Sequence, residues 1–267
     1  MTITGSYTDI EVTLGDNYVA VVEMQRPPHN FFDISLINQI ADAYSAMDKH
    51  PDCRAIVLAS QGKNFCAGAN FGAGSESAGN AQRSGGGKIS GHLYRHAVCI
   101  FEAKTPVIAA VQGAAIGGGL GLAVSADFRV TCPEGRFSAN FTRLGFHPGF
   151  GLTYTLPLLI GHNKAAQLFY TGRRVKGEEA VAIGLADKLA TLDTVRSTAI
   201  ELAEEIAGSA PLAVAATRAT LRGDIAERVR AATEHELAEQ NRLRLTNDWS
   251  EGVTAMAARR APRFTGT

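Results

Sequence analysis

Short apolar runs rich in β-branched residues recur along the chain as far as Asp193. Such runs predict buried strands, and they occupy residues 18–24, 55–59, 107–111 and 128–131. Between the first two runs, residues 35–47 carry apolar side chains at helical spacing, which predicts a helix capped by Asp33 or Ser35. Strands that alternate with helices in this way are typical of an α/β core built from packed layers.

The pattern changes in the last part of the chain. Phe137, Ala139 and Phe141 still alternate with polar neighbours, which predicts a half-buried strand. After Asp193 the strand signal ends, and the composition becomes helical, rich in Ala, Leu, Glu and Arg, over residues 195–206, 212–221, 225–245 and 251–260. The sequence therefore predicts an α/β core over residues 1–195 and a helical C-terminal region over residues 196–267.

A glycine–serine segment at residues 71–90 fits neither pattern. Its twenty residues include six glycines and four serines, with few side chains to bury. We therefore expect a long, mobile loop. A loop of this length inside a compact domain is either functional or a disordered surface insertion, and the sequence favours neither interpretation.

The charge balance excludes several classes of partner. The chain has 26 basic and 26 acidic side chains, so no net field favours nucleic acid or an anionic membrane. No apolar run is long enough to span a bilayer, and the N-terminus lacks the basic-then-apolar pattern of a signal peptide. The cysteines show neither the paired spacing of zinc ligands nor a disulfide framework. We expect a cytoplasmic protein with no bound metal.

Two segments of small residues carry suggestive chemistry: residues 64–70 (NFCAGAN) and residues 113–121 (GAAIGGGLG). Each follows a predicted strand and leads toward a helix, where small residues let a ligand approach backbone N–H groups closely. Two N–H groups aimed at one point stabilise an oxyanion or enolate. The second segment matches neither a dinucleotide-binding fingerprint nor a phosphate-binding loop, and no G-x-S-x-G nucleophile elbow occurs. A glycine turn needed only for tight packing is the alternative.

Six ordered groups of residues share one register along nearly the whole chain. They are Arg26-Pro27 with Asn30, residues 65–69 (FCAGA), residues 105–119 (TPVIAAVQGAAIGGG) with 126–129 (ADFR), residues 144–151 (LGFHPGFG), residues 170–173 (YTGR) with 184–186 (GLA), and Glu251-Gly252 with Arg259-Arg260, Pro262 and Phe264. Together they resemble the signature segments of the enoyl-CoA hydratase/isomerase (crotonase) family.

The resemblance implies a crotonase-like α/β fold, in which a spiral of ββα units of the ClpP/crotonase type is followed by a helical C-terminal trimerisation region. It also implies an acyl-CoA substrate, with coenzyme A as part of that substrate and no further cofactor, and a homotrimer or dimer of trimers. The family's oxyanion hole corresponds to the backbone N–H groups of Ala67 and Gly118. Residues implied to bind the substrate are Cys66, Ala69, Asn70, Gly117, Gly121, Phe141, Gly149, Met256 and Arg259.

Three of these residues have a specific expectation. Met256 and Arg259 match C-terminal residues that contact the nucleotide end of CoA in the family, and a guanidinium suits a phosphate. Plain solvated charge at a chain end is the alternative for Arg259. Cys66 is expected to be a small packing residue, because the sequence shows no base or cation beside it that would activate a thiolate.

The chain departs from the family at the two positions that carry its acid–base chemistry. Family hydratases hold a water between two glutamates, and the matching positions here are Gly121 and Phe141. Neither side chain transfers a proton, and general acid–base catalysis contributes about 10² to 10⁴ in rate for each group. We therefore expect hydration by the two-glutamate mechanism to be disfavoured in this member of a lyase and isomerase family.

Other side chains are candidate substitutes for the glutamates. His147 follows Phe141 in a segment that lines the family's pocket, and an imidazole is a plausible base near neutral pH. A structural histidine on a loop is the alternative. The weaker candidates are His29, Asp33, Glu76 and the helically spaced pair His92 and His96, which lacks a third metal ligand.

Three functions follow from the sequence. The first is an acyl-CoA-processing enzyme of the hydratase/isomerase group, in which the oxyanion hole stabilises a thioester enolate. The second is a non-catalytic acyl-CoA-binding protein that kept the pocket and lost the carboxylates. The third is a carbon–carbon bond hydrolase of the same fold that acts on a free diketone without CoA.

Overall fold

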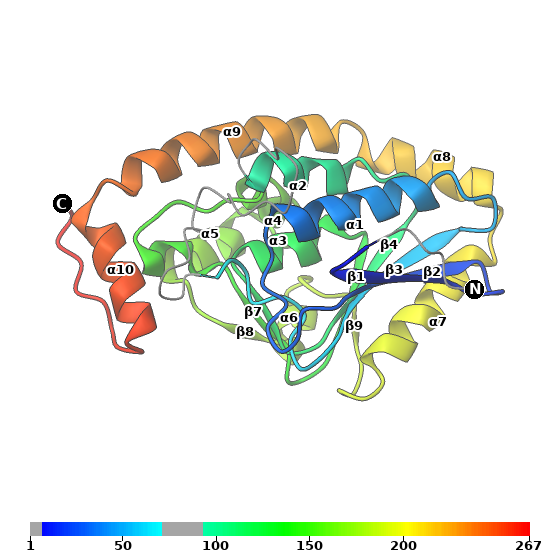
Figure 1. The fold of residues 1–267 in the computed structure, drawn as a ribbon, viewed down its shortest axis with the longest axis horizontal. Coiled ribbons are helices and arrows are strands. Elements are labelled where there is room, and N and C mark those ends of the chain that lie inside the picture. The colour runs from blue at the N-terminus through cyan, green and yellow to red at the C-terminus, as the bar shows by residue number, and fades with distance from the viewer. Residues whose placement is uncertain (1–6, 71–92) are drawn as a thin grey trace.

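A six-stranded sheet forms the centre of the molecule (Figure 1). The computed structural model describes residues 7–70 and 93–267, so the glycine–serine segment, with Glu76 and His92, lies outside the described residues. In spatial order the strands are β1 (Ile10–Leu14), β2 (Val19–Met24), β3 (Ala55–Ser60), β4 (Val107–Val111), β6 (Phe128–Thr131) and β9 (Lys188–Leu189). β1 runs antiparallel to β2, and the later neighbours in the sheet pair in parallel.

Helices cover both faces of this sheet, as the buried strand runs predict. Along β3, Ile56 and Leu58 point into the main core, which also contains the buried side of α1 (Ile34–Met47). The alternate residues Ala55, Val57 and Ala59 pack with α7 (Val195–Ala207) on the opposite face. The predicted helix cap is confirmed, because the Asp33 carboxylate accepts the N–H of Leu36 at 2.9 Å.

A smaller sheet of β5 (Ala114–Ile116), β7 (Arg136–Ser138) and β8 (Val175–Lys176) lies next to the central one. The strand predicted to include Phe141 is shorter than expected. Pairing of β7 ends where Ser138 meets Ile116, the last residue of β5, and residues Asn140–Leu144 turn into a 3-10 helix, η2. Phe141 therefore lies on η2 and is not part of a strand, because the pairing of β7 with β5 has already ended at Ser138.

The remaining helices surround the sheets and form the C-terminal part. They are α2 (Leu93–Phe101), α3 (Gly118–Ser125), α4 (Leu152–Ile160), α5 (His162–Thr171), α6 (Gly177–Ala182), α8 (Pro211–Arg222), α9 (Ile225–Leu243) and α10 (Asn247–Ala257). α9 crosses α2 and α4, and α10 returns to pack against η2 (Figure 1). Within the described residues, no helix is both long and apolar enough to cross a bilayer.

Helix α8 carries exposed apolar side chains. None of its residues is buried, and Leu212 and Leu221 are 86% and 82% exposed. The two leucines are nine positions apart and so lie on opposite sides of the helix, where they do not form one contiguous patch. The trimer implied by the resemblance stays a prediction.

One carboxylate connects α8 to the core. Asp127, between α3 and β6, pairs with Arg218 and Arg222 at 2.9 Å each, and the three side chains are only 10–14% exposed. Its Oδ2 also accepts the N–H of Val107, the first residue of β4, at 2.8 Å. The Asp127 carboxylate thus binds two arginines of α8 and the first N–H group of β4, and in this way it holds α8 against the central sheet.

We expect Asp127→Asn to destabilise the protein by about 3 kcal/mol, because it leaves two largely buried guanidinium groups without their counter-charge. Urea unfolding followed by circular dichroism measures this. Arg228→Ala is the matched control, since it removes an exposed i,i+4 pair with Asp224 and should cost at most about 0.5 kcal/mol. Equal losses in the two variants would contradict the role of Asp127.

Candidate functional site

The two glycine-marked segments lie side by side because their backbones pair. Cys66 and Ala115 form a parallel bridge. The N–H of Cys66 donates to the carbonyl of Ala114 at 2.8 Å, and the N–H of Ile116 donates to the carbonyl of Cys66 at 3.1 Å. This pairing brings the turn at residues 67–69 against the start of α3.

Only glycine fits at the turn itself. Gly68 has φ +86°, and a Cβ at this position would lie 2.6 Å from the carbonyl oxygen of Ile116. The same position lies 3.9 Å from the backbone nitrogen of Gly118. The absence of a side chain at residue 68 therefore lets the turn approach the N-terminus of α3 closely.

The structure corrects which amide of the turn is available to a ligand. The N–H of Ala67 donates to the carbonyl of His29 at 2.9 Å, so the predicted donor is already used inside the protein. The N–H of Ala69 has no acceptor among the described residues, and neither has the N–H of Gly118. Gly118 is the first residue of α3, where amides have no partner within the helix. The pair of open donors is Ala69 and Gly118.

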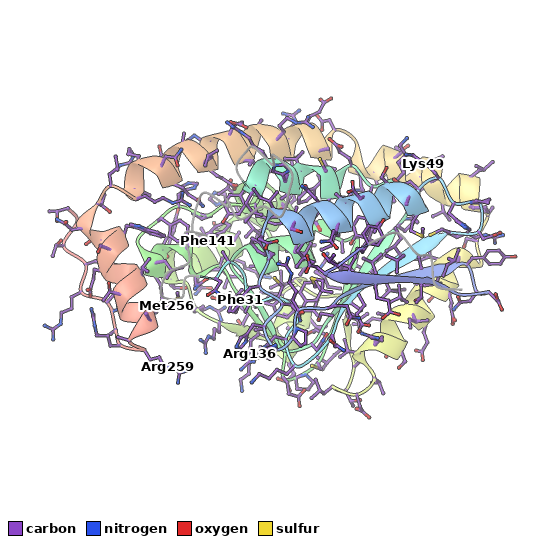
Figure 2. All side chains as sticks on the ribbon, in the orientation of Figure 1. Phe31, Lys49, Arg136, Phe141, Met256 and Arg259 are labelled. Carbon is purple, nitrogen blue, oxygen red and sulfur yellow. The ribbon has the colours of Figure 1, made fainter. Side chains whose placement is uncertain are left out.

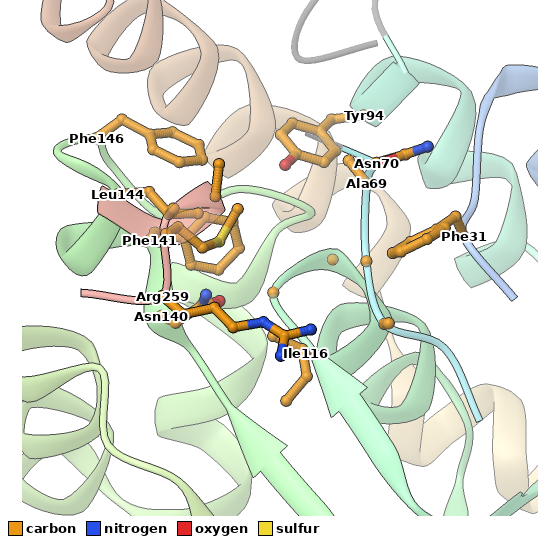
Figure 3. A pocket seen from close by; sticks show the side chains of 16 residues that line it. Phe31, Ala69, Asn70, Tyr94, Ile116, Asn140, Phe141, Leu144, Phe146 and Arg259 are labelled. Carbon is orange, nitrogen blue, oxygen red and sulfur yellow. The ribbon is translucent and has the colours of Figure 1, made fainter. Parts of the chain in front are cut away.

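A cavity of about 450 Å³ opens beside these amides (Figure 3). Of the residues predicted to act or bind there, Ala67, Ala69, Asn70, Gly117, Gly118, Phe141, Met256 and Arg259 line it, whereas Cys66, Gly121, His147 and Gly149 do not. Figure 2 shows Phe31, Phe141, Met256 and Arg259 gathered in the part of the molecule next to α10. The loop after β2, the two glycine segments, η2 and the end of α10 thus meet at one site.

The cavity also has lining side chains that the sequence analysis missed. Phe31, Tyr94, Asn140, Leu144 and Phe146 contribute to it. A helical stripe of apolar residues identifies the buried side of α2, but the stripe does not reveal that Tyr94 borders a cavity. Leu144 and Phe146 belong to the later family segment, whose apolar residues gave no separate signal.

Aromatic packing fills the space at both glutamate positions. A Cβ on Gly121 would lie 2.6 Å from the ring of Phe150, so no side chain fits there. Phe141 packs edge-on against Phe146, with ring centroids 5.6 Å apart, and Phe146 packs in the same way against Trp249 at 4.8 Å. The side of the cavity next to η2 is therefore mostly apolar, with the Asn140 amide as its polar group.

The structure places His147 away from the cavity, which corrects its prediction as a substitute base. Its Nδ1 lies 2.9 Å from the carbonyl oxygen of Pro148, and its ring packs edge-on against His235 of α9. Its own carbonyl accepts a hydrogen bond from Gln240 at 2.8 Å. His147 thus contacts α9 through its ring and its backbone carbonyl, while its Nδ1 contacts the neighbouring residue of its own loop.

Few ionisable groups face the cavity. Among the described lining residues they are Tyr94 and Arg259. Burial raises the pKa of Tyr94 to about 12, so its hydroxyl stays protonated at neutral pH. Burial likewise raises the pKa of the Cys66 thiol to about 12, which leaves it unreactive in its packing position. No group of three or more His, Cys, Asp and Glu side chains that could hold a metal occurs in the described part of the chain.

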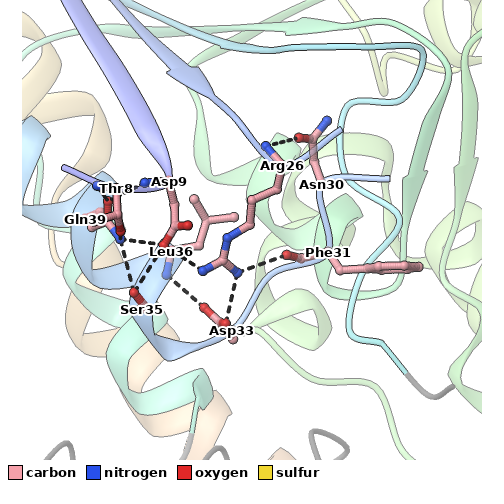
Figure 4. Close-up of polar contacts among 9 residues, drawn as sticks. All are labelled: Thr8, Asp9, Arg26, Asn30, Phe31, Asp33, Ser35, Leu36 and Gln39. Carbon is pink, nitrogen blue, oxygen red and sulfur yellow. Dashed lines mark hydrogen bonds and ion pairs between the residues drawn. The ribbon is translucent and has the colours of Figure 1, made fainter. Parts of the chain in front are cut away.

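A polar network holds the loop that carries Phe31 and the His29 carbonyl (Figure 4). Arg26 pairs with Asp9 at 2.6 Å and with Asp33 at 2.9 Å. The guanidinium group lowers the pKa of Asp9 by hydrogen bonding and by its charge. Asn30 is fully buried, and its side-chain amide donates to the carbonyls of Gln61 and Asn64. The loop is thereby fixed beside the turn at residues 67–69.

The last residues of the chain hold α10 in place. Glu251 pairs with Arg260 at 2.6 Å and accepts the N–H of Arg263 at 2.7 Å. These bonds lower the pKa of Glu251 to about 2. The carbonyl of Thr267 accepts the N–H of Asn247, the first residue of α10, at 2.7 Å. Arg259 makes no side-chain hydrogen bond or ion pair with the described residues, and its side chain extends into the cavity (Figure 3).

The fold and the paired amides define a class of protein that can hold a carbonyl oxygen between two backbone donors. Comparison with known proteins agrees. The family model described as enoyl-CoA hydratase/isomerase matches residues 15–267. A peroxisomal Δ(3,5)-Δ(2,4)-dienoyl-CoA isomerase of Arabidopsis thaliana is 30% identical over 97% of this chain and 98% of its own. A probable enoyl-CoA hydratase of Mycobacterium tuberculosis is 33% identical over 85% of this chain and 87% of its own.

Solved structures agree with the sequence relatives. An enoyl-CoA hydratase/isomerase from Pseudoalteromonas atlantica superimposes with a TM-score of 0.84 at 28% identity, over 97% of this chain and all of the other. The chain belongs to the enoyl-CoA hydratase/isomerase family, and the predicted crotonase fold is confirmed. It is a crotonase-family acyl-CoA enzyme by descent.

We expect Gly121→Ala to destabilise the protein by about 1–3 kcal/mol, because even a methyl group here must displace the buried Phe150 ring. Thermal unfolding measures the loss. Gly208→Ala is the matched control: its φ is −72° and its new Cβ would meet atoms no closer than 3.5 Å. If Gly121→Ala leaves the stability of the protein unchanged, a side chain does fit at the glutamate position.

Proposed function

We propose that the cavity binds an acyl-CoA thioester whose carbonyl oxygen accepts the N–H groups of Ala69 and Gly118. The observation that carries this proposal is the pair of N–H groups without an acceptor among the described residues, at Ala69 and Gly118. They lie where the segment of residues 64–70 comes closest to the segment of residues 113–121. Backbone donors of this kind are worth most when charge develops on the oxygen, as in an enolate. Substrate binding would use the lining residues around them, including Asn70, Gly117 and Phe141.

The proposed reaction does not use the two-glutamate mechanism of hydration. Gly121 lacks space for a side chain and Phe141 is an aromatic lining residue. The proposal is therefore an acyl-CoA-processing enzyme in which the amide pair stabilises a thioester enolate. The relatives include both an isomerase and a probable hydratase, and their names alone do not select the reaction of this chain.

We further propose that Met256 and Arg259 contact the CoA part of the substrate. Both residues line the cavity from the end of α10. Arg259 is the only cationic side chain among the described lining residues, and it has no carboxylate partner there. A guanidinium group in this position matches a phosphate oxygen well.

The amide pair predicts that butyryl-CoA binds more tightly than S-butyl-CoA, the thioether that lacks only the carbonyl oxygen. Two hydrogen bonds worth about 1 kcal/mol each give a difference of about 30-fold in Kd. Isothermal titration calorimetry measures both constants, with free CoA as the baseline. Equal affinities would exclude the amide pair as the carbonyl site. Failure of every CoA thioester to bind would instead favour a CoA-independent hydrolase.

Arg259→Gln should weaken binding of butyryl-CoA by about 3- to 10-fold, since an exposed guanidinium contributes less than a buried one. The loss should shrink as the salt concentration rises. S-butyryl-pantetheine, which lacks the nucleotide, should bind the wild type and the variant equally. Arg228→Gln, on the outer side of α9, is the control. A similar loss for the pantetheine thioester would refute a contact between Arg259 and the nucleotide.

A further inference from the structure

Tyr94 is the one tyrosine among the described residues that line the cavity. It lies in the first turn of α2 and is only 7% exposed. Figure 3 shows its hydroxyl directed into the space between Asn70 and the side chains of η2. The same cavity contains the amides of Ala69 and Gly118. A thioester held by those amides would therefore extend its acyl group into the space that the phenol faces.

A side chain from α9 lies beside this phenol. Gln240 is fully buried, and its Nε2 and Cε2 of the Tyr94 ring both border the space that Gly149 leaves open. The side-chain amide of Gln240 lowers the pKa of Tyr94, although burial raises it more strongly. Its Nε2 donates to the carbonyl of His147 at 2.8 Å, which fixes the direction of the amide. A donor aimed at a phenol oxygen stabilises the phenolate more than the phenol. Gln240 is thus placed to influence both the position and the ionisation of Tyr94.

The residue facing Tyr94 leaves room for it. A Cβ on Gly149 would lie 2.2 Å from Cε2 of Tyr94 and 2.7 Å from Nε2 of Gln240. The ring of Phe150 packs edge-on against the Tyr94 ring, with centroids 6.1 Å apart. Gly149 does not line the cavity itself. Because it has no side chain, the Tyr94 ring and the Gln240 side chain can both lie against its backbone.

Charged groups from α9 also face the phenol. The carboxylate of Glu236 raises the pKa of Tyr94 and the guanidinium of Arg244 lowers it, both less strongly than burial. Glu236 is itself occupied, because it accepts the N–H groups of Gly151 and Thr153 at the start of α4. The phenol is thus an acid at neutral pH, with a fixed donor ready to stabilise its anion.

We propose that Tyr94 transfers the proton at the α-carbon of the bound thioester, and that Gln240 is the positioning residue that holds it. This inference rests on the proposed function, because the enolate must first be held by the amides of Ala69 and Gly118. Tyr94 would supply the acid–base group that Gly121 and Phe141 do not.

The step balances without a further reactant. The enolate returns its electron pair to the α-carbon, where a C–H bond forms as the O–H bond of Tyr94 breaks, and the thioester carbonyl is restored. The phenolate then accepts the N–H of Gln240 and takes a proton from solvent water. In the reverse direction the phenolate removes the α-proton, and the two amides stabilise the enolate oxygen.

Exchange of the α-protons of butyryl-CoA in D₂O tests this proposal, because it needs no knowledge of the natural acyl group. Mass spectrometry should show exchange catalysed by the wild type, with a rate that rises about tenfold per pH unit from 7 to 10, since the phenolate is the base. Tyr94→Phe should lower the rate by at least about 100-fold. Its Kd for butyryl-CoA should stay within about twofold, because the carbonyl site is unchanged.

Two further variants separate positioning from a structural effect. Gln240→Leu keeps the phenol but removes its donor, so exchange should fall by the same factor at each pH from 7 to 10 and should still rise about tenfold per pH unit. Tyr94→Phe should lose this rise with pH. Gly149→Ala should reduce exchange by displacing the ring while Tyr94 is still present. Tyr154→Phe, a partly buried tyrosine that does not line the cavity, is the matched control.

The outcomes are distinguishable. If butyryl-CoA binds and the wild type does not exchange its α-protons, or if Tyr94→Phe exchanges them at the wild-type rate, the assignment of Tyr94 is wrong and the proposed function stands. If Gln240→Leu exchanges the α-protons at the wild-type rate, Gln240 does not position Tyr94, and if it loses the rise with pH, Gln240 has only a structural role. If no CoA thioester binds, the proposed function fails and the assignment of Tyr94 fails with it.

Discussion

The site depends on one backbone pairing, the parallel bridge between Cys66 and Ala115. It is short, but it sets the distance between two segments that are far apart in the sequence. Glycines at 68 and 119 make the approach possible, since a Cβ at either position would collide with a carbonyl oxygen of the opposite segment, at 2.6 and 2.1 Å. Because the donors are backbone groups, their geometry is inherited from the fold and survives changes in the side chains around them.

That independence would let the chain keep the proposed thioester site without the family's glutamates. The proposed carbonyl site consists of backbone groups, whereas proton transfer needs side chains that extend from η2, α2 or α3. Among the described residues of these elements that line the cavity, the side chains are aromatic, amide or aliphatic groups, and Tyr94 is the one that has a dissociable proton.

The sequence predicted the elements well, because local patterns determine them: β4 and β6 have the expected bounds, and the C-terminal helices lie where composition placed them. It also identified both segments of the amide pair. It did not identify the correct amide, because the carbonyl of His29 occupies the N–H of Ala67 through a contact between distant residues. His147 was misjudged and Tyr94 was missed for a similar reason. Both residues contact α9, and the sequence pattern does not show how a helix so distant along the chain packs against them.

The two positions that lack the family's glutamates, Gly121 and Phe141, are each packed into a cluster of aromatic rings. Phe150 occupies the space beside Gly121 and also contacts the ring of Tyr94, while Phe141 is joined through Phe146 to Trp249 on α10. Restoring a carboxylate at either position would require a cluster of rings to rearrange, and a charge placed among them would lack the water that normally solvates it. In such apolar surroundings a neutral phenol costs less to bury than an ionised carboxylate. The aromatic packing beside Gly121 and Phe141 is therefore compatible with a neutral proton donor such as the one proposed at Tyr94.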